Sequence, residues 1–188
     1  EVGAGILGIV DLGAQAGQLA AVTFVQIGNL DRCPSPSAWL ETSSLWIMDS
    51  LTPHCRLLPI CPEAVAGLGI PRPPIQLVQT GDSIRARGRD LPHTDVTDRL
   101  ETIAGIISRV YPGLCGFILQ SRSPSCGLGT TPVFAASGQI IDPTGSGIFA
   151  ARLRQAFPDL PMLNDSDLTN DAIQRFLHQI QLRAIQLG

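Results

Sequence analysis

The chain alternates short apolar runs with longer helical patterns, and this alternation restricts the folds open to it more than any other feature. Apolar runs typical of buried strands occur at 21–27, 56–60, 114–119 and 160–163. Helical patterns follow them at 38–51, 96–110, 148–157 and 170–184. Strands that alternate with helices predict an α/β protein with a mainly parallel, Rossmann-like sheet and helices on both faces.

The remaining segments predict one hairpin within a single domain. The runs 75–79 and 83–87 flank Thr80-Gly81-Asp82, a short connection typical of two antiparallel strands. A chain of 188 residues fits one α/β domain that covers 1–188. Within this domain, we expect 1–32 to be an atypical N-terminal segment.

The charge of the chain limits its partners. All 13 basic residues are arginine, and 16 acidic residues leave a net charge of −3. Duplex DNA and acidic membranes bind clustered cations, so we expect neither as a partner. A local patch at Arg85, Arg87 and Arg89 is the alternative, because clustered arginines can hold a phosphate or a short RNA. Schiff-base chemistry is excluded because the sequence has no lysine.

The five cysteines indicate thiols that are free or bound to metal. Their number is odd, and their spacing is not that of a small disulfide-rich secreted protein. No N-terminal run resembles a signal peptide either. We therefore predict a reducing, cytoplasmic location.

Two cysteines follow predicted strands. Cys61 comes directly after 56–60, and Cys126 lies in the polar segment after 114–119. The carboxyl ends of parallel strands meet at one edge of a sheet, where ligands bind in this class of fold. We expect the two thiols to chelate a metal at that edge. The alternative is that each cysteine is a small apolar residue of the core.

The segments around these two cysteines resemble a known family. The loop after Cys61-Pro62-Glu63 is rich in proline and glycine, and the segment 121–127 is the most specific motif. On these motifs, 57–177 resembles the DUF523 family, whose characterised members are thiouracil desulfidases and a related tRNA 4-thiouridine desulfidase. The matching residues are Cys61-Pro62-Glu63, Gly67, Pro71-Arg72-Pro73-Pro74, Asp95-Val96-Thr97, Ser123-Pro124-Ser125-Cys126-Gly127, Gly145-Ser146-Gly147-Ile148-Phe149-Ala150 and Leu160-Pro161.

The resemblance implies an iron–sulfur desulfidase. In such an enzyme, three cysteines hold a [4Fe–4S] cluster whose open iron binds the sulfur of a thiolated pyrimidine, while water replaces that sulfur on carbon. A soft sulfur atom suits this site better than a hard, oxygen-ligated metal. The expected substrate is a free thiouracil-type base or a 4-thiouridine-type nucleotide in RNA. The acidic pI of about 5.5 favours the small molecule.

The resemblance also assigns residues to these tasks. Cys61 and Cys126 match two cluster ligands. Glu63 matches the acid/base position, and Ser121 or Ser123 is expected to assist it by hydrogen bonding. Substrate binding is assigned to Arg72, Ser125, Gly145, Ser146 and Gly147. A plain helix start explains the glycine-rich turn 145–147 equally well.

The first third of the chain departs from the family. The family opens with motifs of the Cys-Leu-Leu-Gly and Arg-Tyr-Asp-Gly types, and neither is present. Cys33, in the loop after the first predicted strand, holds the matching place and is our candidate for the third ligand. Cys55 competes with it, but six residues before Cys61 along a strand it would lie about 20 Å away. Cys115 begins its strand and is expected in the core.

A second class of function remains open. Gln120 stands where the family usually has a lysine, and if Cys33 is not a ligand, the chain lacks the third cysteine that the resemblance implies for a cluster. The protein would then be a non-catalytic relative that acts as a structural or interaction subunit. The iron content of the purified protein separates the two hypotheses.

Overall fold

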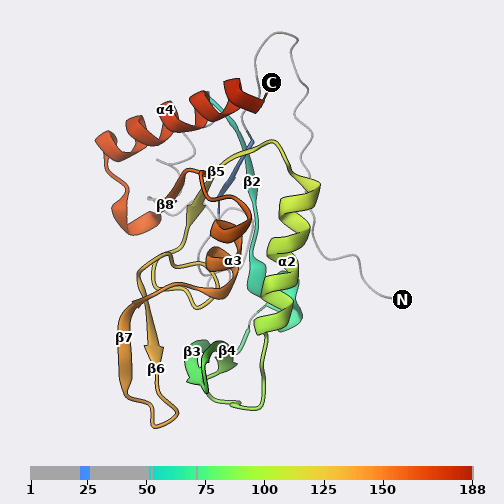
Figure 1. The fold of residues 1–188 in the computed structure, drawn as a ribbon, viewed down its shortest axis with the longest axis vertical. Coiled ribbons are helices and arrows are strands. Elements are labelled where there is room, and N and C mark those ends of the chain that lie inside the picture. Colours follow the sequence, from blue (N-terminus) through green and yellow to red (C-terminus); the bar gives the residue numbers. More distant parts are fainter. Residues whose placement is uncertain (1–21, 26–50, 52, 71, 188) are drawn as a thin grey trace.

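The computed structural model describes residues 22–25, 51, 53–70 and 72–187, which form two four-stranded sheets and the helices packed on them (Figure 1). In chain order the elements are β1 (Val22–Val25), β2 (Arg56–Pro59), η3 (Ala64–Leu68), β3 (Ile75–Thr80), β4 (Ser83–Gly88), α2 (Thr97–Val110), β5 (Leu114–Leu119), β6 (Thr131–Phe134), β7 (Ile140–Gly145), α3 (Ile148–Ala156), β8 (Met162–Asn164), η4 (Asp165–Asp167) and α4 (Asn170–Leu187).

The first sheet is parallel throughout, with the strand order β2-β1-β5-β8. Every residue of β5 is buried, because this strand lies inside the sheet and both of its faces are covered. Its apolar sequence therefore reflects its place in the fold. The predicted α/β class with a mainly parallel sheet is confirmed.

Helices cover both faces of this sheet, as predicted. Phe117 and Leu119 of β5 pack into a core cluster that includes residues of α2 and α3. Ile118 joins a second cluster with the buried side of α4. That side of α4 consists of Ala172, Ile173, Phe176, Leu177, Ile180 and Ala184. Alternate residues of one strand thus hold helices on opposite faces.

The second sheet has the order β4-β3-β6-β7 and mixes both strand directions. The hairpin β3–β4 is antiparallel, as predicted, while β6 pairs parallel to β3 and antiparallel to β7. Strands β6 and β7 were not predicted from the sequence, and each contains a proline. Pro132 lies at a register shift between β6 and β7, and Pro143 lies on an edge strand. These are the positions where a sheet tolerates a missing N–H.

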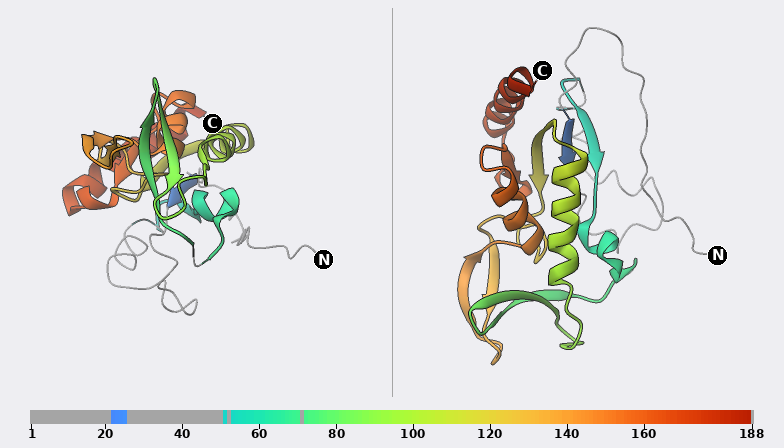
Figure 2. Two further views of the ribbon diagram at one scale, coloured as in Figure 1. Left: turned by 90° about the horizontal axis from the view of Figure 1, so that it is seen from below. Right: turned by 45° about the vertical axis from the view of Figure 1, so that its right-hand side comes forward.

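The two hairpins of the second sheet are inserted between parallel strands and their following helices. β3–β4 separates β2 from α2, and β6–β7 separates β5 from α3. Figure 2 shows both hairpins at the same end of the molecule. The segments that leave the carboxyl ends of β2 and β5 therefore run between the two sheets.

The N-terminal predictions are only partly covered by the described residues. Strand β1 lies within the predicted run 21–27, whereas the predicted helix 38–51 is described only at Leu51, which is buried. No helix in the described part of the chain has the length and apolar character needed to span a membrane.

Candidate cysteine centre at the end of the parallel sheet

Cys61 and Cys126 lie beyond the carboxyl ends of two parallel strands. Cys61 comes two residues after the end of β2 and is partly buried, while Cys126 follows β5 and is fully buried. Strand β1 lies between β2 and β5 and runs parallel to both. Strand β1 therefore ends at the same edge of the sheet, between the ends of β2 and β5.

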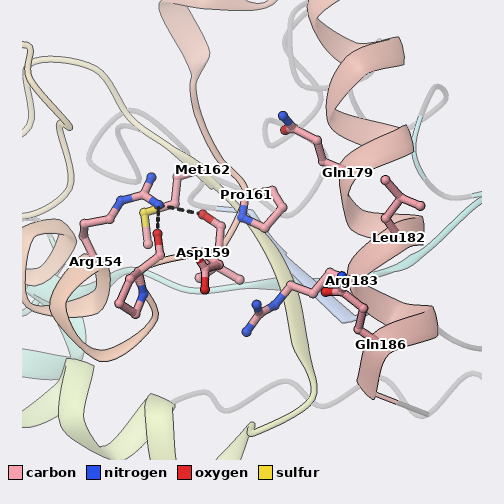
Figure 3. Close-up of a pocket in the computed structure, with 10 residues that line it drawn as sticks. Arg154, Asp159, Pro161, Met162, Gln179, Leu182, Arg183 and Gln186 are labelled. Carbon is pink, nitrogen blue, oxygen red and sulfur yellow. Dashed lines mark hydrogen bonds between the residues drawn. The ribbon is translucent and has the colours of Figure 1, made fainter.

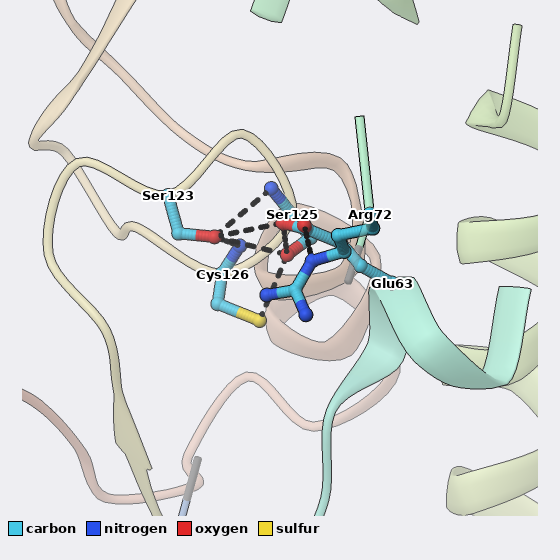
Figure 4. A network of polar contacts seen from close by, with 5 residues as sticks. All are labelled: Glu63, Arg72, Ser123, Ser125 and Cys126. Atoms are coloured by element: carbon cyan, nitrogen blue, oxygen red, sulfur yellow. Dashed lines mark hydrogen bonds and ion pairs between the residues drawn. The ribbon is translucent and has the colours of Figure 1, made fainter. Parts of the chain in front are cut away.

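A buried network of polar side chains surrounds Cys126 (Figure 4). Ser125 Oγ lies 2.8 Å from Glu63 Oε1 and 3.3 Å from Cys126 Sγ, so its single proton can bond to either atom. Ser123 Oγ lies 2.9 Å from Ser125 Oγ and 3.3 Å from Glu63 Oε1. The three residues Glu63, Ser123 and Ser125 are at most 7% exposed. The network links a carboxylate to a cysteine sulfur away from solvent.

Arg72 completes this network on its other side. Its Nε donates to Glu63 Oε2 at 2.6 Å, and both side chains are largely buried. A buried carboxylate needs such a partner, because its charge is costly to remove from water. Arg72, which was assigned to substrate binding from the sequence, thus contacts Glu63 directly.

The two thiols share an electrostatic environment that favours their protonated form. Burial raises the pKa of Cys126 well above its usual value, and nearby Glu63 and Cys61 raise it further, while hydrogen bonds from Ser125 and Ser123 oppose this. Burial also raises the pKa of Cys61. Binding of a metal would have to displace their protons.

The start of α3 supports the backbone around Cys126. The N–H groups of Gly147, Ile148 and Ala150 donate to the carbonyls of Gly127, Pro124 and Ser125, at 2.7, 3.1 and 3.1 Å respectively. A Cβ atom on Gly147 would lie 2.3 Å from the carbonyl carbon of Ser125 and 2.5 Å from the nitrogen of Cys126. Only glycine allows the helix to come so close. Gly147 therefore borders the cysteine segment.

The other predicted site residues lie around this centre or outside it. The hydroxyl of Ser121 bonds to Asp165 at 2.5 Å and so faces η4, whereas Ser123 contacts Glu63. Ser146 Oγ accepts a hydrogen bond from the backbone of Gly129 at 2.9 Å. Gly145 is buried against β6. Cys33 lies outside the described residues.

The two remaining described cysteines belong to the core. Cys55 and Cys115 are buried in the cluster formed with α4, and their thiols donate to the carbonyls of Leu51 and Gly113. The expectation for Cys115 is confirmed.

Two residues that contact this region, Asn164 and Asp165, were not predicted from the sequence. Asn164 and Asp165 bond to the segment that carries Cys126, across 36 and 44 positions of the chain. Periodicity and local motifs report on neighbours in sequence, so neither could have indicated these contacts. The one available signal was their position directly after a predicted strand.

The ligand atoms that Cys61 and Cys126 offer are of the type that an iron–sulfur cluster binds. Cys61 and Cys126 offer soft sulfur ligands, which iron–sulfur clusters require. Within the described ranges, no group of three or more histidine, cysteine or acidic side chains gathers as a metal site. The described residues thus supply two thiols of the three that the resemblance implies.

A separate cleft of about 410 Å³ lies between the end of α3, the start of β8 and α4 (Figure 3). Arg154 donates there to the carbonyls of Pro158 and Leu160, and Arg183 donates to the carbonyl of Leu114. The cleft is at the amino end of the parallel strands and contains no thiol. Its arginines connect the ends of secondary-structure elements.

A protein family and a solved structure resemble this chain. The family model described as 2-thiouracil desulfurase matches residues 40–165. Among solved structures, the fold is similar to that of a [4Fe–4S]-dependent thiouracil desulfidase, TudS, with a TM-score of 0.56 and 21% sequence identity. The similarity covers 87% of this chain and 99% of that chain. No curated protein matches the sequence.

Proposed function

Because the chain belongs to the 2-thiouracil desulfurase family, we propose that it removes sulfur from a thiolated pyrimidine. In the balanced reaction, water supplies the oxygen that replaces sulfur on the ring, and the sulfur leaves as hydrogen sulfide. The observation that carries this proposal is the buried contact of Glu63 and Ser125 beside Cys126, at the edge of the sheet where Cys61 also follows a parallel strand.

We assign the cofactor to a cysteine triad of Cys33, Cys61 and Cys126. Strand β1 supports this assignment, because it ends at Val25 between β2 and β5, and Cys33 follows eight residues later in the sequence. When bound, a [4Fe–4S] cluster with one uncovered iron would supply a soft Lewis acid for the thiocarbonyl sulfur.

Glu63 is the proposed proton carrier. Its carboxylate is held at Oε2 by Arg72 and at Oε1 by Ser125 and Ser123, so its position beside Cys126 is fixed. A carboxylate held in this way can accept a proton from the attacking water and return one to the departing sulfur. Ser123 and Ser125 orient it, and Arg72 pairs with it away from bulk water.

The substrate is proposed to bind beside the cysteine segment. The turn 145–147 borders this segment because Gly147 packs on Ser125 and Cys126. We assign Gly145, Ser146 and Gly147 to the wall of the substrate site. Ser121 lies at the start of the segment that carries Cys126. Its hydroxyl bonds to Asp165, so we assign it to the support of that segment.

Anaerobic purification followed by iron analysis and a sulfide-release assay tests this function. We expect bound iron and sulfide release from 2-thiouracil or 4-thiouracil. Glu63→Gln should lower kcat by about 10²–10⁴-fold, because proton transfer of this kind contributes that much to the rate. Glu101→Gln, an exposed change on α2, is the matched control and should leave kcat unchanged.

Two outcomes would contradict the proposal. Full activity of Glu63→Gln would remove Glu63 as the proton carrier. Iron-free protein that releases no sulfide from either base would favour the non-catalytic alternative, in which the chain acts as a structural or interaction subunit.

A further inference from the structure

The segment that carries Cys126, which we call the cysteine loop (121–128), is tied at its first residue to the end of β8. Asp165 Oδ1 accepts hydrogen bonds from Ser121 N at 2.8 Å and Ser121 Oγ at 2.5 Å. Ser121 Oγ in turn accepts a hydrogen bond from Ser166 N at 3.0 Å. One serine is thus held by three contacts to η4.

The last residue of the cysteine loop is tied to the same place. Asn164 Oδ1 accepts from Leu128 N at 3.1 Å, and Asn164 Nδ2 donates to Leu128 O at 3.0 Å. Asn164 is only 7% exposed. The pairing satisfies both backbone groups of Leu128, and it requires a short side chain with both a donor and an acceptor, which is asparagine.

The backbone between these two anchors is strained. Arg122 has a φ of 61°, a left-handed conformation that is unfavourable for a residue with a Cβ atom. Its N–H donates to Thr130 Oγ1 at 3.0 Å. Such a conformation persists only where surrounding contacts enforce it, and the anchors at Ser121 and Leu128 lie on either side of it.

We propose that Asn164 and Asp165 are positioning residues, which fix both ends of the cysteine loop and so set the place of Cys126 beside Glu63 before any cofactor binds. The role of these residues in preparing a cofactor site rests on the proposed function, whereas the hydrogen bonds that anchor the loop do not depend on it. Asn164 and Asp165 are adjacent at the end of β8, and they hold the two ends of the cysteine loop, which follows β5. The end of a single strand therefore determines the shape of this loop.

The rate at which iodoacetamide alkylates single cysteines tests this proposal. The full chain is treated with an iron chelator, and alkylation is followed peptide by peptide in Asn164→Asp, Asp165→Ala and the parent. Cys126 is fully buried, so it reacts only when the cysteine loop opens. Cys115 is 2% exposed, lies in β5 and serves as the internal reference.

We expect Cys126 to react at least about tenfold faster in both variants, because each loses hydrogen bonds that oppose loop opening. Cys115 should keep its parent rate. Ser166→Ala is the matched control and should match the parent, since among the described residues its hydroxyl bonds to Asp167 and not to the loop.

An unchanged rate at Cys126 in both variants would overturn the proposal, and so would equal acceleration at Cys126 and Cys115, which reports general destabilisation. In parallel, iron loss to the chelator should be faster in both variants than in the parent. If the parent binds no iron but Cys126 is selectively accelerated, the proposed function fails while the anchoring stands.

Discussion

Gly147 packs directly against the backbone that carries Cys126, and this contact yields a sharp prediction. Gly147→Ala would place a Cβ atom 2.3–2.5 Å from backbone atoms of Ser125 and Cys126, which cannot move aside as a flexible side chain can. We expect a loss of about 1–3 kcal/mol in the free energy of unfolding, as for other overpacked sites. Urea unfolding measures it.

Gly105→Ala is the matched control for this substitution. Gly105 lies inside α2, and a Cβ atom there meets nothing within 4 Å. Because alanine favours helix over glycine, Gly105→Ala should be neutral or stabilising by up to about 1 kcal/mol. Equal stability of the two variants would show that the contact between α3 and the cysteine loop is not tight.

The ion pair between Arg72 and Glu63 gives a second prediction at this scale. Arg72→Met leaves the Glu63 carboxylate buried without its guanidinium partner, so the free energy of unfolding should fall by about 2–4 kcal/mol. In the double variant Arg72→Met/Glu63→Gln, no unpaired charge remains, and at least half of that loss should return. Urea unfolding of the single and double variants forms the test, and simple additivity would contradict it.

The helices and strands with a clear pattern of apolar residues could be predicted from the sequence. Strand β5 has the predicted bounds, and the predicted helix 170–184 lies within α4. Strands β6 and β7 could not be predicted, because their prolines resemble turn signals and the pairing of β6 with β3 is long-range. An edge position and a register shift, which accommodate those prolines, are properties of the assembled sheet.

The junction between β4 and α2 gives a prediction about pH. Burial opposes ionisation of Asp95, but hydrogen bonds from Arg85 and Thr97 outweigh it and lower its pKa from 3.8 to about 2. A lowered pKa in the folded state stabilises the protein above the unfolded value, and the gain is lost as pH falls from 3.8 towards 2. Asp95→Asn should therefore cost about 1–2 kcal/mol at neutral pH and progressively less between pH 4 and 2.

Urea unfolding at several pH values measures this difference. Asp98→Asn is the control, because the Asp98 side chain is 80% exposed although it also bonds to Arg85. An exposed pair of this kind is worth less than about 1 kcal/mol. A stability difference for Asp95→Asn that stayed constant down to pH 2 would contradict the role of the Asp95 charge.

Across the whole molecule, the site lies where the parallel sheet meets the second sheet. The sequence predicted that Cys61 and Cys126 follow strands that end at one edge, and the structure places both there. The anchoring by Asn164 and Asp165 was not predictable, since it depends on β8 pairing with β5. Local motifs indicate the cysteines, whereas the topology decides which distant residues contact the segments that carry them.

The charge distribution of the molecule predicts a free base, not RNA, as substrate. The net charge is −3, and Arg85 and Arg87 of the predicted patch both pair with Asp95. An enzyme that binds RNA through several phosphates loses affinity steeply with salt, because bound counterions are released. We therefore expect kcat/KM for 4-thiouracil to change less than about twofold between about 50 and 200 mM salt.

Competition with RNA completes this test. Unmodified tRNA in excess should not inhibit sulfide release from 4-thiouracil, because the arginines of β4 already pair with Asp95 and Asp98. Strong inhibition, together with faster sulfide release from tRNA that contains 4-thiouridine and a steep loss of that rate with salt, would instead identify RNA as the substrate. The same assay on Arg85→Gln would then show whether this hairpin contacts the phosphates, since the salt slope would fall with each contact removed.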